Sequence, residues 1–243
     1  MSENKQAYVV RFTLQQRIEH FITMVTFFTL CLTGLAEKFS AAGWAQAVVH
    51  VMGGIDTNRL VHRICGWVMA ISTVVHFANA SLTMLSKRLG FTMVPNLQDF
   101  KDAILQLRNY LGLTTDHPHY DRYDYKQKFE YWGLVFGNVI MVVTGLILIF
   151  PVPFAGLVSG QLIPAAKVAH SNEGLMAFLV ITIWHIFNAH LGPDVFPFDA
   201  SMFTGKISRA RMEHEHPVEL ARMEGRAYDA QAAHGSHGEG HGA

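Results

Sequence analysis

The sequence predicts an all-α integral membrane protein, a four-helix bundle with a cytoplasmic loop helix and a C-terminal extension. Half of the 243 residues are hydrophobic and only 16% are charged. The charged residues avoid four long segments, at about Phe21–Ala36, Ile64–Leu85, Tyr131–Phe150 and Leu175–Leu191. With its flanks, each segment reaches the roughly 20 residues that a helix needs to cross a bilayer. A span must satisfy its own backbone hydrogen bonds, and these runs are too long for barrel strands.

Polar residues and prolines set the expected helix ends. The helices are expected at about Arg17–Lys38, at Arg59–Ser86, from the Tyr131 segment to Pro151, and from Ala165 to just before Pro193. Between the second and third helices, the stretch Asn96–Leu113 has the apolar spacing of an amphipathic helix, and Asn96 suits its N-cap. This helix is expected either on the membrane surface or against a partner.

Four regions follow from this pattern. Residues 1–16 are expected to form a polar arm, and residues 17–192 the membrane domain. Residues 193–226 are charged and are expected to form a cytoplasmic extension. Residues 227–243 are rich in glycine and histidine, a composition typical of a disordered tail.

The positive charges give the orientation. Fifteen of the nineteen Lys and Arg residues lie in the N-terminal arm, the middle connection and the C-terminal tail. Because cytoplasmic connections carry the excess of Lys and Arg, both termini are expected on the cytoplasmic side of the inner membrane. The first apolar segment lacks a small-residue cleavage site and is expected to remain as a membrane helix. The net charge of zero favours no nucleic-acid partner.

Histidines recur inside the apolar segments at regular spacings. His62 and His76 are 14 residues apart, His170 and His185 are 15 apart, and His20 opens the first segment. Each spacing separates two imidazoles by roughly 21–23 Å along a helix and leaves them on nearly one face. An imidazole inside a bilayer is costly, so each histidine is expected to have a functional partner. Facing helices of this kind predict two stacked bis-histidine haem sites, which transfer electrons because no axial position is open.

The outer site is expected to use His62 and His170. His185 is expected at the inner site, where either His76 or His20 could complete the pair, and spacing alone does not choose between them. Gly66 and Gly174, each four residues after an outer histidine, would leave room for a porphyrin face, although small residues also permit close helix packing.

Other residue types narrow the haem chemistry. Three arginines near the membrane edges suit the haem propionates, because the guanidinium is a planar fork that matches a carboxylate; they are Arg17, Arg59 and Arg63. The two cysteines, Cys31 and Cys65, lie in apolar segments. Neither a C-x-x-C-H sequence nor an iron–sulfur pattern occurs, so the two haems are expected to be non-covalent haem b.

Several motifs together resemble the cytochrome b (gamma) subunit of membrane-bound formate dehydrogenases, in the wider superfamily of the nickel–iron hydrogenase cytochromes b. The resemblance spans most of residues 10–225. The motifs are Arg17-Ile18-Glu19-His20 with Thr33-Gly34-Leu35, Leu60-Val61-His62 with Gly66, Tyr123 to Lys128 with Trp132 and Thr144-Gly145, His170 with Gly174 and then His185, and Thr204-Gly205-Lys206 with His214-Glu215-His216-Pro217.

This resemblance implies that His20 and His185 hold the inner haem, that His62 and His170 hold the outer one, and that a menaquinone site lies beside the inner haem. The chain departs from the family in three places. It has Asp124-Tyr125-Lys126-Gln127-Lys128 where the family has Asn-Ala-Gly-Gln-Lys, its His76 has no counterpart, and its fourth helix has one extra residue between the histidines. The first departure concerns the contacts of the quinone, and the second and third keep the pairing of His76 with His185 open, as in the cytochrome bc complexes.

The expected function is that of a membrane di-haem cytochrome b subunit of a quinone-linked respiratory oxidoreductase. Its expected partners are an iron–sulfur or multihaem cytochrome c subunit, membrane lipid, and menaquinone or ubiquinone. Asp124, Lys126 and His185 are the candidates for hydrogen bonds or protons to the quinone. The alternatives are a haem-bearing anchor without a quinone site, and a metal-ion transporter that uses the histidines of the helices and of the tail.

Overall fold

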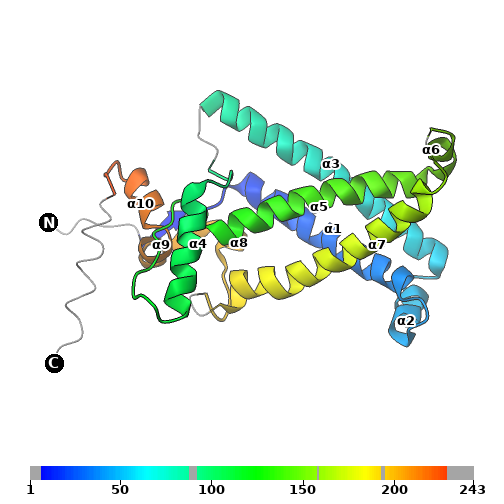
Figure 1. Ribbon diagram of the computed structural model, residues 1–243, viewed down its shortest axis with the longest axis horizontal. Coiled ribbons are helices and arrows are strands. Elements are labelled where there is room, and N and C mark those ends of the chain that lie inside the picture. The colour runs from blue at the N-terminus through cyan, green and yellow to red at the C-terminus, as the bar shows by residue number, and fades with distance from the viewer. Residues whose placement is uncertain (1–6, 88–91, 158, 193–194, 229–243) are drawn as a thin grey trace. The chain divides into compact units, whose positions relative to one another are not determined.

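The computed structural model describes residues 7–87, 92–157, 159–192 and 195–228. Among these residues, four helical stretches are long and apolar enough to cross a membrane: Leu14–Lys38, Ile55–Thr83, Tyr125–Ile149 and Leu162–Leu191. They run lengthwise through the bundle (Figure 1). The predicted all-α membrane bundle is therefore confirmed, with a two-stranded sheet as its one addition in the described residues. The expected disordered tail lies, apart from residues 227 and 228, outside the described residues.

The chain forms two compact units, a helical bundle of residues 12–88 and 132–203 and a smaller unit of residues 1–11, 89–131 and 204–243. The bundle begins with α1, Leu14–Lys38, three residues before the expected start. Thr13 accounts for the difference. Its hydroxyl accepts from the Gln16 N–H at 3.2 Å, and the Gln16 side chain accepts from the Thr13 N–H at 3.0 Å. This reciprocal capping satisfies free donors of the first turn.

A short helix, α2 (Gly43–Val51), precedes the second long helix, α3 (Ile55–Lys87). Gly53 and Gly54 both have positive φ, which lets the chain turn sharply between α2 and α3. The fully buried Asn58 then donates to the Thr33 carbonyl at 3.2 Å and to the Glu37 carboxylate at 3.0 Å. Because an unpaired amide in a bilayer is costly, this residue fixes α3 against α1.

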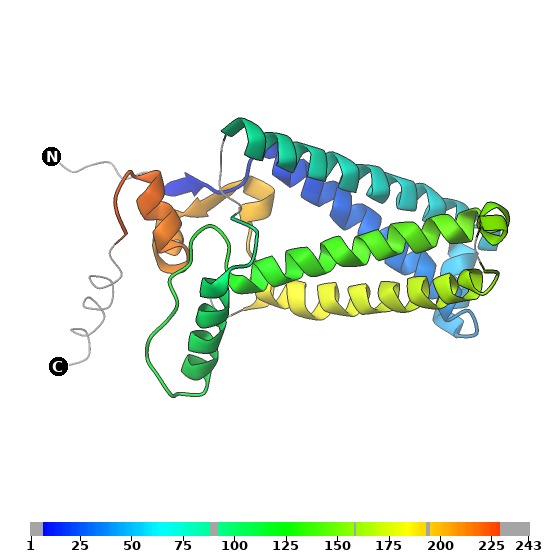
Figure 2. The same cartoon turned by 45° about the horizontal axis from the view of Figure 1, so that its top comes forward.

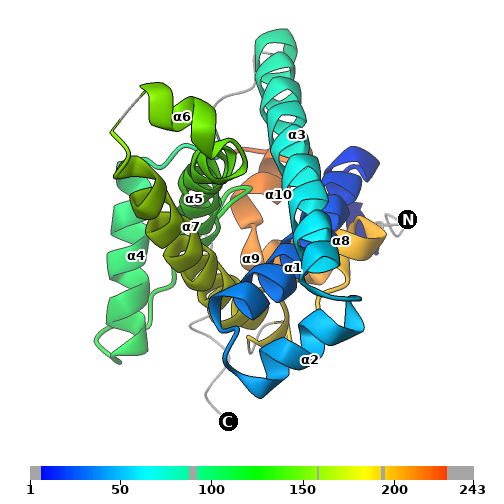
Figure 3. The same ribbon diagram turned by 90° about the vertical axis from the view of Figure 1, so that its right-hand side faces the viewer.

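The third long helix, α5 (Tyr125–Ile149), stops where prolines were expected to stop it. Pro151 then begins a separate short helix, α6 (Pro151–Leu157), because proline fits the first turn of a helix, where its missing N–H is not needed. α2 and α6 lie at the same end of the bundle (Figure 1), the end that faces the viewer in Figure 3.

The fourth span changes its winding along its length. It starts as α7, Leu162–Leu179, and continues as two π-helical segments, η1 (Val180–His185) and η2 (Phe187–Leu191). The sequence predicted a plain helix here. π-helical turns are rare and occur frequently at functional sites, so the change in winding marks the end of the span that carries His185.

The polar groups of the bundle point inward and its apolar groups outward. Thr33 and Asn58 are fully buried, whereas Val74, Phe136 and Ile183 are each about two-thirds exposed. This pattern suits lipid, which is as apolar as the side chains that face it and leaves small and polar groups for the contacts between helices. α1 packs beside α3, and α5 runs beside α7 (Figure 2).

The smaller unit gathers segments that are far apart in the sequence. β1 (Tyr8–Val10) pairs antiparallel with β2 (Lys206–Ser208), with Val9 opposite Ile207. β2 follows α8 (Ser201–Thr204) and leads into α9 (Arg209–Glu215) and α10 (Pro217–Met223). Ile207, Met212 and Leu220 form its buried apolar core. The N-terminal arm and the C-terminal extension, expected as separate regions, thus share one sheet.

The predicted loop helix is confirmed as α4, Leu97–Tyr110, with Asn96 as its N-cap. The Asn96 side chain accepts from the Asp99 N–H, and Asp99 accepts from the Asn96 N–H at 2.7 Å. Asp99 also pairs with the buried Lys128 ammonium at 2.7 Å. Hydrogen-bonded charges of this kind are costly to separate once buried, so the pair fixes α4 to the residues that begin α5.

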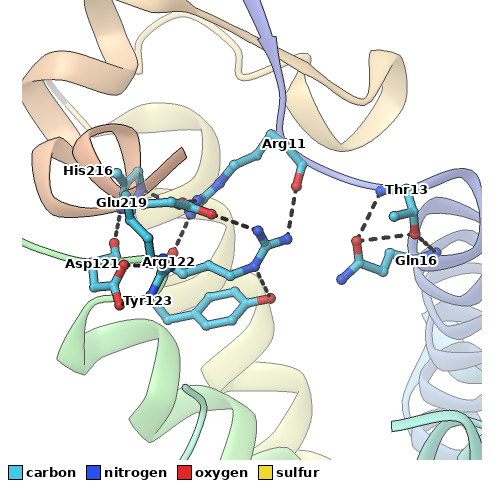
Figure 4. A network of polar contacts seen from close by, with 9 residues as sticks. Arg11, Thr13, Gln16, Asp121, Arg122, Tyr123, His216 and Glu219 are labelled. Atoms are coloured by element: carbon cyan, nitrogen blue, oxygen red, sulfur yellow. Dashed lines mark hydrogen bonds and ion pairs between the residues drawn. The ribbon is translucent and has the colours of Figure 1, made fainter. Parts of the chain in front are cut away.

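A buried ionic network joins the arm, the loop and the extension (Figure 4). The Glu219 carboxylate accepts from both Arg11 and Arg122, the latter at 2.6 Å. His216 faces the Arg11 guanidinium at 3.1 Å, and its Nδ1 donates to the Asp121 carbonyl at 2.7 Å. Burial, reinforced by the arginine charges, lowers the pKa of His216 to about 3. The histidine is therefore neutral in the folded unit.

Lowering the pH from about 7 to about 5 is expected to destabilise the unit that contains His216. An unfolded histidine titrates near pH 6.5, about three units above the folded pKa. Below pH ~6.5 the unfolded chain binds a proton that the folded unit excludes, and stability falls by about 1.4 kcal/mol per pH unit until the folded pKa is reached. Limited proteolysis of the C-terminal extension at stepped pH measures this loss.

The matched variant is His216→Gln, which retains a polar side chain but does not titrate. It should be cleaved faster than the wild type at neutral pH, because the ring packing is lost, but with a flatter dependence on pH. A wild-type cleavage rate that stays constant between about pH 7 and 5 would contradict the neutral, buried histidine.

Candidate functional site

Two pairs of histidines face each other inside the bundle. The ring centres of His20, on α1, and His185, in η1, lie 6.3 Å apart. Those of His62, on α3, and His170, on α7, lie 6.2 Å apart. A metal–imidazole bond is about 2.0–2.1 Å and the ring centre lies about 1 Å further, so one metal ion between two imidazoles sets their centres about 6 Å apart. Both pairs therefore fit bis-histidine ligation of one iron.

The two pairs occupy different depths along the bundle. His20 lies in the second turn of α1, and Thr33, which contacts His62, lies 13 residues further along the same helix. At 1.5 Å per residue this places the pairs roughly 20 Å apart. The structure thus brings together the four histidines that the resemblance implied as ligands, in two stacked sites.

Each outer histidine bonds to a threonine. His62 Nδ1 lies 2.8 Å from the Thr33 hydroxyl, and His170 Nδ1 lies 2.9 Å from the Thr144 hydroxyl. Each hydroxyl also donates its only proton to a carbonyl one turn earlier, that of Thr29 at 2.7 Å and that of Ile140 at 2.6 Å. The hydroxyl must therefore accept from the imidazole, which places the ring proton on Nδ1. Nε2 is left with its lone pair, as a metal ligand requires.

A glycine follows each of these threonines, and the structure shows why. A Cβ on Gly34 would lie 3.0 Å from Cε1 of His62, and one on Gly145 would lie 3.3 Å from Cε1 of His170. The threonine therefore holds the imidazole while the glycine leaves space for its edge. Sequence reasoning used Thr33-Gly34 and Thr144-Gly145 as family motifs and missed this role; the signal was the same dipeptide in two spans.

The π-helical winding bears on the inner pair. His170 and His185 are 15 residues apart, and on a regular α-helix that spacing turns the second ring by roughly 60° from the first. A π-helical turn takes up about one additional residue. The η1 segment, which ends at His185, therefore changes the direction of this ring relative to a regular α-helix.

His76 has a different neighbour. Its Nδ1 lies 2.8 Å from the Glu19 carboxylate. The other Glu19 oxygen accepts from Asn79 at 3.2 Å and from Gln15 at 2.9 Å. The structure thus places His20 beside His185 and gives His76 a carboxylate on the adjacent helix.

The three arginines expected at the propionates differ in their surroundings. Arg17 is partly buried and donates to the Phe203 carbonyl, and its Nε is buried without a hydrogen-bond partner. Arg59 is exposed and lies 3.5 Å from Glu37, while Arg63 is exposed. Only Arg17 combines burial with an unsatisfied donor, which is the condition that a bound carboxylate would relieve.

The residues expected at the quinone are not all in one unit. Asp124 and Lys126 belong to the smaller unit, whereas His185 belongs to the bundle. Asp124 caps α5, because its carboxylate accepts from the Gln127 N–H at 2.7 Å. Burial raises the pKa of Asp124. Its signal in the sequence is Asp followed three residues later by Gln, the pattern of a capping box.

The described residues contain no group of three or more His, Cys, Asp or Glu side chains that could hold a metal ion. A path for metal ions through the bundle would need such oxygen or nitrogen ligands in succession.

Comparison with known proteins places this site in context. A family model described as prokaryotic cytochrome b561 matches residues 11–205. The cytochrome b556(fdo) subunit of formate dehydrogenase from Escherichia coli (strain K12) is 26% identical over 211 residues, 86% of this chain and 90% of that protein. The nitrate-inducible cytochrome b556(Fdn) subunit from the same strain is 23% identical over 218 residues, 88% and 91% of the two chains. A Haemophilus influenzae formate dehydrogenase cytochrome b556 subunit is 25% identical over 181 residues, 74% and 70% of the two chains.

Replacing either threonine by valine is expected to weaken the outer site. Thr33→Val and Thr144→Val each remove the acceptor of the imidazole Nδ1–H, and losses of this kind cost about 10- to 100-fold in metal affinity. The fraction of outer haem retained through purification, with its midpoint potential, measures the effect. Thr33→Ser keeps the hydroxyl and should restore both.

Thr29→Val is the matched control on the same helix. The Thr29 hydroxyl donates to the Val25 carbonyl at 2.8 Å, as Thr33 does one turn later, but Thr29 contacts no histidine in the described residues. If Thr29→Val lowers haem retention as much as Thr33→Val, the threonine acts on helix α1 rather than on the ligand.

Proposed function

Because the chain belongs to the prokaryotic cytochrome b561 family, and is thus a multi-pass haem-binding membrane protein, we propose that it is the di-haem subunit of a quinone-linked respiratory oxidoreductase. His62 and His170 hold the outer haem b, and His20 and His185 hold the inner one. Two haems so held supply a route for electrons between the faces of the membrane.

The observation that carries this proposal is the pair of facing imidazoles at each depth. The ring separations, 6.3 and 6.2 Å, are alike although the four histidines come from different parts of the chain. A bilayer makes an unpaired imidazole costly. Two such pairs, roughly 20 Å apart, form two equivalent sites for iron rather than one larger site for another ligand.

The partner and the quinone follow from the relatives and the sequence. The relatives are subunits of formate dehydrogenases by name, which supports a place beside the other subunits of a dehydrogenase complex. The proposed partner in that complex is an iron–sulfur or multihaem cytochrome c subunit. Menaquinone or ubiquinone is the second redox partner. Asp124, Lys126 and His185 remain the proposed contacts of the quinone, and the raised pKa of Asp124 suits a group that exchanges protons.

The proposed location is the inner membrane, with both termini in the cytoplasm. The excess of Lys and Arg in the arm, the middle connection and the tail supports this orientation. The pair His62–His170 then lies toward the outer surface, where a partner subunit exchanges electrons, and the pair His20–His185 lies toward the cytoplasm, near the quinone.

The purified complex is expected to contain two non-covalent, low-spin haem b groups for each copy of this chain. His62→Ala and His170→Ala should each remove one haem and leave the spectrum of the other unchanged, because a lost ligand opens the iron and leaves an unfilled apolar space. Haem extraction and redox difference spectra measure this. One haem per chain, or haem that resists extraction into acid acetone, would falsify the proposal.

His20→Ala and His76→Ala separate the two possible inner pairs. His20→Ala should lose the inner haem and its reduction by an added quinol, because His20 faces His185 at 6.3 Å. His76→Ala should keep the inner haem, because the His76 imidazole bonds to the Glu19 carboxylate on α1. Loss of the inner haem in His76→Ala alone would overturn this pairing. A quinol that reduces neither haem in the wild type would instead indicate that the subunit is a haem-bearing anchor without a quinone site.

A further inference from the structure

A second histidine follows His185 in the same π-helical region. Winding is π-helical on both sides of Ile186, and the Gly192 N–H donates to the Phe187 carbonyl at 2.7 Å, five residues back. In an α-helix, a residue five positions on would point roughly 140° away. In a π-helix, the hydrogen bonds join residues five apart, so His190 comes to nearly the same side as His185.

On the facing helix, α1, Arg17 lies on the side that carries the inner histidine. It precedes His20 by three residues on α1, and residues three apart on a helix are neighbours on one face. The inner pair is thus flanked by Arg17 on α1 and by His190 on the π-helical end of the fourth span.

A chain of contacts joins Arg17 to His190 within the bundle. The His190 ring stacks on Phe198, with ring centres 4.4 Å apart and planes within 4°. Phe198 packs on Phe203 at 5.4 Å, and the Phe203 carbonyl accepts from the Arg17 guanidinium. The stacking fixes the plane of the imidazole, and the carbonyl fixes the guanidinium.

Both side chains have a buried nitrogen that lacks a partner. In the described part of the chain, Arg17 Nε and His190 Nδ1 are among the few buried side-chain atoms without a hydrogen bond. Buried polar atoms are nearly always bonded, so an unsatisfied one requires an explanation, and a bound group is one. Asp199, the nearby carboxylate, accepts from the Ser201 N–H at 2.6 Å. The two orphaned nitrogens call for an anionic oxygen acceptor.

We propose that Arg17 and His190 together bind a propionate carboxylate of the haem held by His20 and His185. This inference rests on the proposed function. The arginine contributes the charge and the histidine a second N–H, so the carboxylate is held from two helices. The sequence does not reveal this role, because on a regular α-helix His190 would point away from the haem. A lipid phosphate has the same acceptor chemistry and is the competing source of the oxygen.

The test uses the complete complex, loaded with haem that carries ¹³C in its propionate carboxyls. Arg17→Gln and His190→Gln should each shift the labelled carboxylate bands in redox difference infrared spectra. Arg17→Gln should also lower the midpoint potential of the inner haem, by about tenfold in its reduction equilibrium, because the lost charge no longer offsets the propionate. Arg17→Lys should restore the potential and only part of the band position.

Lys167→Gln and His50→Gln are the controls, since each removes the same kind of side chain from an exposed position of the bundle. Neither should change the labelled bands or the inner potential. If Arg17→Gln and His190→Gln leave the labelled bands unchanged while both haems are present, the pair does not bind a propionate, and a lipid phosphate is the remaining ligand. Absence of the inner haem from the wild-type complex would instead count against the proposed function.

Discussion

An imidazole inside a bilayer must find a partner for each of its two nitrogens, and the architecture of this bundle depends on that requirement. Thr33 and Thr144 satisfy it on one side of the outer rings, because their hydroxyls have already given their protons to the helix behind them. The opposite nitrogen of each ring thereby keeps its lone pair, and the two rings face each other with centres 6.2 Å apart. Since water is absent from the hydrocarbon core, solvent cannot satisfy either nitrogen of the ring instead.

The same requirement explains features that otherwise look unrelated. Gly34 and Gly145 are small because a Cβ would push the held imidazole away. The stretch that leads to His185 is wound as a π-helix in η1, and His185 faces His20 from this segment. Winding, small residues and threonines therefore act together to orient rings whose positions along the helices are set by spacing alone.

The smaller unit buries charged side chains in one hydrogen-bonded network. Glu219 lies between Arg11 and Arg122, and His216 is kept neutral beside them. A buried carboxylate is tolerated only when its hydrogen bonds are complete. The network consequently requires the arm, the loop and the extension at once, and it accounts for a β-strand pair between segments nearly two hundred residues apart.

The sequence by itself determined the four spans, the loop helix with its Asn96 cap, and the set of candidate histidines, because hydrophobicity, caps and spacing are local properties of the chain. It left the inner pair open between His20 and His76, since both lie at a suitable depth. Only the tertiary structure placed His20 beside His185 and His76 beside Glu19. It also revealed the hydrogen bonds of the threonines and the position of His190. The threonine bonds depend on which helices face one another, and the position of His190 depends on π-helical winding. Residue spacing along a regular α-helix predicts neither.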